Sequence, residues 1–225
     1  MSARRILVVA AHPDDEILGM GGTIAKHALH EGAEVAILWV TEGSSQQYPG
    51  DVEIMERKFL EARAAAKILG VTDCRQHHLP DMRLDTLPHV EVNKVIEDAV
   101  AEFGPDTVYT VHADINMDHS TVFRSVMVAT RPRVGTPVRR VLSYAPMSSV
   151  EWTPHFENTF RPNWFSNISD TIEDKIRSFD CYTTENRPWP HPRSPRAIRA
   201  IAESWGSSAG WACAEPFVLI RQLCD

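Results

Sequence analysis

Short apolar runs alternate with helix-like segments through the first half of the chain, and this alternation constrains the fold more than any other feature. Continuous apolar runs rich in β-branched residues are typical of strands buried on both faces of a sheet, and they predict strands over residues 6–10, 35–40 and 107–111. Strong helix formers closed by glycine predict helices over residues 20–30, 54–69 and 90–103. This order predicts an α/β fold with a mostly parallel sheet and helices on both of its faces.

The second half of the chain has a different composition. Proline and tryptophan concentrate between Trp152 and Pro195, and a stretch with so much proline cannot be mostly helical. We expect long loops there that cover one edge of the sheet, followed by a last strand over residues 215–221. No long Pro/Gly/Ser-rich linker divides the 225 residues, so residues 1–225 are predicted to form one domain.

Bulk composition narrows the class of protein. The formal net charge is −7, which argues against electrostatic binding to nucleic acid or anionic lipid. The apolar run near the N-terminus is too short for a signal sequence or a membrane span. The four cysteines form no CxxC pair and are expected to be reduced thiols. These features predict a soluble, cytoplasmic protein with no membrane partner, and they leave a homo-oligomer open.

An acidic segment, AHPDDE at residues 11–16, directly follows the first predicted strand. Several hydrophilic groups at a desolvated sheet edge are costly unless something compensates them. A divalent cation would do so, and the mixture of imidazole and carboxylates suits Zn²⁺ in a catalytic site. His12 and Asp15 are the candidate ligands here. The alternative is that Asp14 or Asp15 only caps the next helix.

A second polar cluster, HADINMDH at residues 112–119, follows the predicted strand over residues 107–111. If the strands are parallel, it emerges at the same edge of the sheet as the acidic segment. His119 is therefore the expected third zinc ligand, and Asp118 could orient a histidine. His112 is more simply explained as a surface or packing histidine than as a ligand.

At this point the sequence resembles a known family. The string His12-Pro13-Asp14-Asp15-Glu16, with the later Asp118-His119, is similar to the PIG-L (LmbE-like) deacetylases, which include the N-acetylglucosaminyl-phosphatidylinositol deacetylase and the deacetylases of mycothiol and bacillithiol biosynthesis. Further similar segments at residues 40–43, 61–71, 79–81 and 214–217 extend the resemblance over nearly the whole chain.

The resemblance implies a Rossmann-like fold, with zinc held by His12, Asp15 and His119. It also implies that Asp14 is the general base that deprotonates the attacking water and can return the proton to the leaving amine. The implied activity is removal of an acetyl group from the amine of a small N-acetylated substrate, expected to be an amino sugar or its nucleotide or glycoside derivative. Two alternatives stay open, an amidase for a larger acyl or thiol conjugate and a non-catalytic sugar- or nucleotide-binding module.

One position departs from the family pattern. Many relatives read His-Pro-Asp-His where this chain has Asn116-Met117-Asp118-His119. An asparagine can donate a hydrogen bond to an oxyanion but cannot carry a proton. Either Asn116 serves only the oxyanion, or another histidine supplies the charge, with His191 in its proline-rich segment and His112 as candidates.

Substrate-binding residues are less constrained by the sequence. The family tends to place a basic residue near the start of the second helix, which Arg57 or Lys58 matches. Trp152, like Trp164 and Trp189, offers a flat face on which a sugar ring could stack, although most tryptophans pack a core. Arg193, or else Arg161, could bind a phosphate of a nucleotide sugar.

Overall fold

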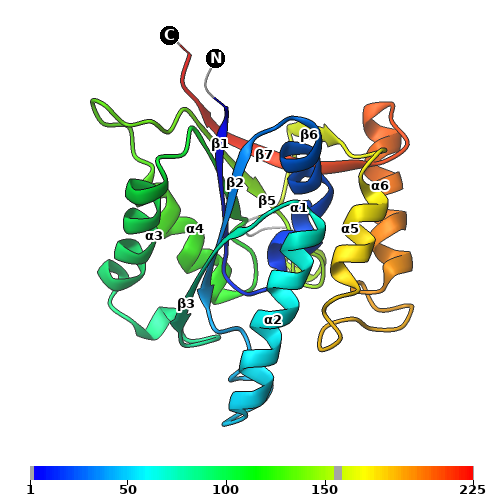
Figure 1. The fold of residues 1–225 in the computed structure, drawn as a ribbon, viewed down its shortest axis with the longest axis horizontal. Helices are drawn as coiled ribbons and strands as arrows, with labels where there is room; N and C mark the ends of the chain where they lie inside the picture. The colour runs from blue at the N-terminus through cyan, green and yellow to red at the C-terminus, as the bar shows by residue number, and fades with distance from the viewer. Residues whose placement is uncertain (1–2, 155–158, 225) are drawn as a thin grey trace.

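The structure, a computed structural model, describes residues 3–154 and 159–224. Within these ranges seven strands form one sheet in the order β3-β2-β1-β4-β5-β7-β6 (Figure 1). Neighbouring strands from β3 to β5 are parallel, whereas β7 runs antiparallel to both β5 and β6. The predicted mostly parallel α/β sheet is therefore confirmed. The strands are β1 (Arg5–Ala10), β2 (Glu34–Thr41), β3 (Asp73–Leu79), β4 (Thr107–Val111), β5 (Arg140–Tyr144), β6 (Trp164–Asn167) and β7 (Ala214–Gln222).

Helices cover both faces of the sheet. Figure 1 shows α3 and α4 together on one side of the sheet, and α1, α2, α5 and α6 on the other. A π-helical turn over Lys26–His30 continues α1, and short 3₁₀ turns lie at Leu84–Thr86 and Val150–Trp152. The helices are α1 (Asp15–Ala25), α2 (Val52–Ile68), α3 (His89–Phe103), α4 (Met117–Ala129), α5 (Ile172–Phe179) and α6 (Pro195–Ala209).

Strand β1 lies at the centre of the core. Val8 pairs with Ile37 of β2 on one side and with Tyr109 of β4 on the other, and all three side chains are buried. Strands β2 and β3 lie on one side of β1, and β4 and β5 lie on the other, so the strand order reverses at β1. In parallel α/β sheets, ligands bind at the carboxyl ends of the strands beside such a reversal.

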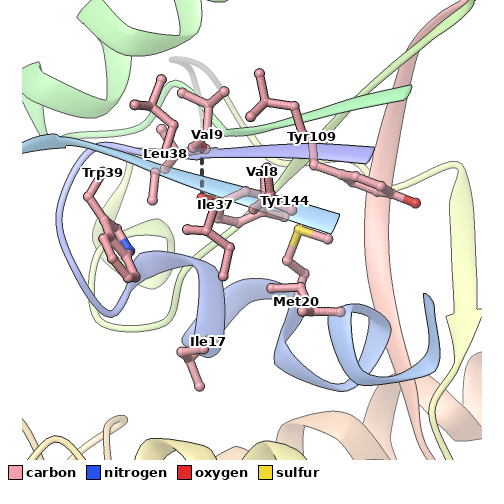
Figure 2. Close-up of a cluster of buried hydrophobic side chains, with 14 of the residues drawn as sticks. Val8, Val9, Ile17, Met20, Ile37, Leu38, Trp39, Tyr109 and Tyr144 are labelled. Carbon is pink, nitrogen blue, oxygen red and sulfur yellow. Dashed lines mark hydrogen bonds between the residues drawn. The ribbon is translucent and has the colours of Figure 1, made fainter. Parts of the chain in front are cut away.

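Helix α1 approaches the sheet closely beside this edge. Figure 2 shows Ile17 and Met20 of α1 packed beneath β1 and β2, together with the ring of Tyr144, whose hydroxyl donates to the backbone carbonyl oxygen of Val9 at 2.9 Å. A Cβ atom at Gly19 would lie 2.3 Å from Cδ2 of Tyr144. Only glycine allows this approach, which fixes the start of α1 against the ends of β1 and β5.

The first helix begins earlier than the sequence predicted. The expected start was Met20, but α1 begins at Asp15 and the backbone of Met20 departs from helical angles inside it. The side chain of Glu215 accepts hydrogen bonds from the backbone N–H groups of Gly22 and Thr23 at 3.0 and 2.7 Å, just beyond that irregular residue. The predicted helix over residues 20–30 therefore corresponds to the second part of α1 and the π-helical turn that continues it.

The proline- and tryptophan-rich stretch is not mostly helical, as predicted, but it contains two regular elements. Strand β6 extends the edge of the sheet beyond β7, and α5 packs against α1 and α2. Residues 155–158 of this stretch lie outside the described residues. Within the described chain, no helix is both long and apolar enough to span a membrane.

Candidate active site

The turn after β1 holds two of the predicted ligands together. Oδ2 of Asp15 accepts a hydrogen bond from the backbone N–H of His12 at 2.9 Å and lies 3.2 Å from Nδ1 of the His12 ring. Asp14, between them in the sequence, has a φ angle of 124°, a strained conformation for any residue other than glycine. Its side chain makes no capping hydrogen bond to α1. Helix capping therefore does not explain the side chain of Asp14.

The third predicted ligand, His119, lies in the first turn of α4. This helix follows β4, which is the neighbour of β1 in the sheet. Nε2 of His119 lies 3.3 Å from Oδ1 of Asp15. On the other side of the ring, Nδ1 lies 2.9 Å from both carboxylate oxygens of Asp114. Ser149 donates a hydrogen bond from its hydroxyl to Oδ2 of Asp114 at 2.6 Å. The imidazole is thus held with one nitrogen toward Asp15.

These residues fit a metal ion. His12, Asp15 and His119 are all buried, and they offer ligand atoms that lie within 4.8 Å of one another. Nε2 of His119 is buried and has no hydrogen-bond partner among the described residues, which is costly unless another group binds it. Two imidazoles and a carboxylate form a donor set that zinc accepts readily.

Carboxylates behind the two imidazoles complete this arrangement. Nε2 of His12 lies 3.1 Å from Asp118 and 3.4 Å from Asp81, while Asp114 holds the far side of His119. A second group, His12 with Asp81 and Asp118, could also hold a metal. Histidines that bind a metal through one nitrogen usually donate the other N–H to a carboxylate. The first group contains two imidazoles that fit this pattern, whereas the second contains one imidazole.

The electrostatic field at this edge attracts cations. Burial alone would lower the pKa of His12, but the Asp15 carboxylate and the hydrogen bond to Asp118 outweigh it and raise the pKa to about 10. Burial likewise disfavours protonated His119, yet Asp15 and Asp114 raise its pKa to about 9. The same carboxylates that draw protons to the imidazoles would stabilise a divalent cation in their place.

Asp14 lines a pocket of about 300 Å³, and His12 is the one of the three candidate ligands that lines it as well. Oδ2 of Asp14 lies 3.2 Å from Nη1 of Arg193. Burial raises the pKa of Asp14 to about 6, against the opposing attraction of the Arg193 and Lys58 cations. The remaining wall of the pocket is mainly polar and includes Gln46, Gln47, Asp81, Met82 and Asn116.

The structure brings some of the other predicted site residues to this pocket. Asn116 lines it and caps α4, where its side-chain oxygen accepts from the backbone N–H of Asp118 at 2.9 Å. Asp118 is fully buried and accepts backbone N–H groups of Met82 and Leu84 at 2.7 and 3.0 Å. Lys58 and Arg193 also line the pocket.

Other predicted site residues do not line this pocket. The Arg57 side chain is 58% exposed and pairs with Glu61 along α2, and Trp152 is 59% exposed. His191 accepts a hydrogen bond at Nδ1 from the backbone N–H of Arg193, so it supports the segment that carries Arg193. Nδ1 of His112 lies 3.0 Å from the Ser143 hydroxyl. Their proposed catalytic and substrate-binding roles stay predictions.

Sequence reasoning missed three acidic residues of the site. Asp114 lies in the polar cluster after β4, where the habit of ligand histidines to pair with a carboxylate could have drawn attention to it. Asp81 follows β3, a strand that was not predicted. Glu185 comes from the loop after α5, and it forms ion pairs with both Lys58 and Arg193. No local pattern around Glu185 marks it as part of a site.

Comparison with known proteins identifies the family. A family profile described as "GlcNAc-PI de-N-acetylase" matches residues 7–130, which is more than half of the chain. The chain belongs to the PIG-L family. This confirms the family and the enzyme class that the sequence predicted, a deacetylase that hydrolyses an amide bond.

Other PIG-L-like proteins resemble the chain over most of its length. A diacetylchitobiose deacetylase of Thermococcus kodakarensis is 28% identical over 94% of this chain and 81% of the relative. The uncharacterized deacetylase YaiS of Escherichia coli is 34% identical over 73% of this chain and 82% of the relative. The crystal structure of the conserved protein TT1542 from Thermus thermophilus superposes with a TM-score of 0.76, at 28% identity, over 98% of this chain and 96% of that one.

Proposed function

We propose that this PIG-L protein is a zinc-dependent hydrolase that removes the acetyl group from the amine of a small N-acetylated sugar. The observation that carries the proposal is the position of Asp14, which is buried and lines a pocket together with His12, one of the three grouped candidate ligands His12, Asp15 and His119. A set of metal ligands beside a carboxylate that is not itself a ligand is the arrangement that metal-assisted hydrolysis requires. The relative from Thermococcus kodakarensis, named for its action on diacetylchitobiose, supports a sugar substrate.

The zinc, held by His12, Asp15 and His119, would polarise the acetyl carbonyl and acidify the attacking water. Asp14 takes a proton from that water while the water oxygen forms a bond to the carbonyl carbon. When the C–N bond breaks, Asp14 returns the proton to the leaving amine, so acetate and the free amine are the products. A pKa near 6 suits a carboxyl that must both accept and donate a proton near neutral pH.

Two groups of residues would hold the substrate. Asn116 has an amide N–H that could donate to the oxyanion as negative charge develops on the carbonyl oxygen. Gln46 and Gln47 offer donors and acceptors to sugar hydroxyls from the pocket wall. Lys58 and Arg193 stand on the same wall, where they could contact an anionic substituent of the sugar.

A second candidate, an amidase for a longer acyl group, is favoured by a separate cavity of about 270 Å³. This cavity is mainly apolar and lies between α1, α6 and the segment after β5, with Met147, Val150 and Trp205 among its lining residues. The same segment contacts the active site, because Ser149 binds Asp114. A longer acyl chain would need such an apolar surface close to the metal.

Acetate release from a panel of N-acetylated sugars tests the proposal. Protein stripped of metal should release no acetate, and addition of zinc should restore the reaction. Matched substrates with acetyl, butanoyl and octanoyl groups separate the two candidates, because a deacetylase should prefer the shortest. A chain that binds no zinc and releases no acyl group would instead support a sugar-binding module. The single domain, the cytoplasmic location and any homo-oligomer stay predictions.

A further inference from the structure

Glu185 is a buried carboxylate that the proposed reaction does not use. It has no exposed surface, although it lies in a loop between α5 and α6, where most acidic side chains would face water. Its backbone N–H donates to the carbonyl oxygen of Tyr182 at 3.1 Å, which fixes the turn that carries it. A fully buried charge is costly unless it is paired, so its partners indicate what it does.

Both cations that pair with Glu185 line the active-site pocket. Oε1 lies 2.8 Å from Nζ of Lys58, and Oε2 accepts a hydrogen bond from Nη1 of Arg193. Lys58 also donates to the backbone carbonyl oxygen of Gly43, next to the metal turn. Nε of Arg193 donates to the Ser148 hydroxyl at 2.7 Å. Each cation is thus held from two directions, and Glu185 is the partner that they share.

The same guanidinium contacts the candidate general base. Nη1 of Arg193 lies 3.2 Å from Oδ2 of Asp14 and is also bound by Glu185. Asp14 and Glu185 therefore compete for one donor group. Without Glu185, Arg193 would keep Asp14 as a carboxylate partner, and a bidentate pair with it would be the strongest contact available to the guanidinium. That pair would occupy both oxygens of the proposed base. Lys58 is also attracted to the Asp14 carboxylate.

We propose that Glu185 is a positioning residue that holds Arg193 and Lys58 on the pocket wall, so that Arg193 orients the Asp14 carboxylate without enclosing it. The proposal rests on the proposed function, because it assigns Asp14 the task of accepting a proton. Glu185 also lines the pocket, but its proposed role is exerted through the two cations. Its negative charge, more than its volume, carries the role, and the isosteric neutral variant Glu185→Gln isolates that charge.

The kinetic test compares Glu185→Gln, Arg193→Met and the double variant, each loaded with zinc. Loss of an outer carboxylate typically costs about tenfold to a hundredfold, and we expect Glu185→Gln to lower kcat by that factor with little change in KM. Because Glu185 acts in part through Arg193, the loss in kcat of the double variant should be smaller than the product of the two single losses. Added guanidinium should partly restore a smaller variant, Arg193→Ala, which a purely structural role would not predict.

Glu61→Gln is the matched control. Glu61 is another buried acid and binds the hydroxyls of Thr183 and Thr184, the two residues before Glu185. It is not among the residues that line the pocket. This variant should lower the melting temperature while kcat stays within about twofold of wild type. Should Glu61→Gln reproduce the kinetic loss of Glu185→Gln, the effect would come from loop stability and the proposal would fail.

A crystal structure of Glu185→Gln decides the geometric claim independently of catalysis. We expect Arg193 or Lys58 to move toward Asp14 and bind both of its oxygens. If both cations keep their wild-type positions, or if the single losses in kcat simply multiply in the double variant, the proposal is wrong. If zinc-loaded wild type releases no acetate, the proposed function fails, and the crystal structure still decides whether Glu185 holds the cations.

Discussion

Nδ1 of His119 lies 2.9 Å from both carboxylate oxygens of Asp114. A carboxylate in this position accepts the Nδ1–H of a neutral imidazole and leaves the lone pair of Nε2 directed at Asp15, 3.3 Å away. The contact therefore selects the tautomer that can bind a metal. It also supplies the carboxylate–histidine pair that commonly accompanies zinc.

The substitution Asp114→Asn tests this relationship. An amide can accept the same N–H but lacks the charge that makes the imidazole a better ligand, so zinc affinity should fall about tenfold to a hundredfold. Competition with a chromogenic chelator measures the Kd. Ser149→Ala removes only the hydroxyl that supports Asp114 and should have a smaller effect. An unchanged Kd in Asp114→Asn would show that Asp114 does not tune the site.

The buried ion pair between Lys175 and Glu215 predicts a large stability effect. Nζ of Lys175 lies 2.6 Å from Oε1 of Glu215 and donates to the carbonyl oxygen of Leu18 at 2.9 Å. Lys175→Met leaves the carboxylate buried without its cation and should lower the free energy of unfolding by about 3–5 kcal/mol. Urea denaturation measures this. The double variant with Glu215→Gln should regain part of the loss, and equal stability of the single variant and wild type would refute the argument.

Gly19 should tolerate no side chain. A Cβ there would lie 2.3 Å from the buried Tyr144 ring, and overpacking of a tight core typically costs about 1–3 kcal/mol. We expect Gly19→Ala to lower the free energy of unfolding by this amount in urea denaturation. Gly21→Ala is the matched control in the same helix, because its nearest neighbour is the aliphatic chain of Lys175 at 3.1 Å. Equal losses in the two variants would contradict the explanation.

His27 predicts a pH dependence of stability away from the active site. Its Nε2 lies 3.0 Å from the Tyr109 hydroxyl and its Nδ1 lies 2.6 Å from Glu31. Burial lowers the pKa of His27 below 6.5. The unfolded chain therefore binds a proton at this residue more readily than the folded chain. The stability that His27 contributes is complete above pH 6.5 and is lost as the pH falls below that value.

The free energy of unfolding should thus fall more steeply in wild type than in His27→Gln between about pH 7 and pH 5. Urea denaturation at several pH values measures both slopes. Charged groups that face His27 are Arg4, Lys26 and Glu31, and they are present in both proteins. Parallel curves for the two proteins would show that His27 does not contribute.

Continuous apolar runs predicted three buried strands correctly, although β5, which is buried to a similar extent, was not predicted. Residues of β1, β2 and β4 are almost entirely buried, and their continuous apolar runs were correctly interpreted as strands. Strand β3 reads DCRQHHL and is half-exposed at the edge of the sheet, so it has no apolar pattern and was missed. The start of α1 was placed too late, because the helix begins with the buried acidic residues Asp15 and Glu16, which the sequence analysis assigned to the site turn.

The candidate site residues were likewise predicted only where the local sequence determines their position. His12, Asp15 and His119 come from segments directly after β1 and β4, so the parallel topology was enough to predict that they lie together. Glu185 reaches the pocket from a loop more than 60 residues beyond β4. Its position depends on how α5 packs on α1 and α2 and how α6 packs on α5, which no local sequence pattern records. Long-range packing, more than chemistry, limited the prediction.

The central claim is that Asp14 exchanges the proton in a zinc-dependent deacetylation. The most direct test measures zinc content and acetate release from N-acetylated sugars for wild type and Asp14→Asn side by side. We expect about one zinc per chain in both proteins, with acetate release about a hundredfold to ten-thousandfold slower in the variant. A variant that keeps its zinc and releases acetate at the wild-type rate would contradict the account.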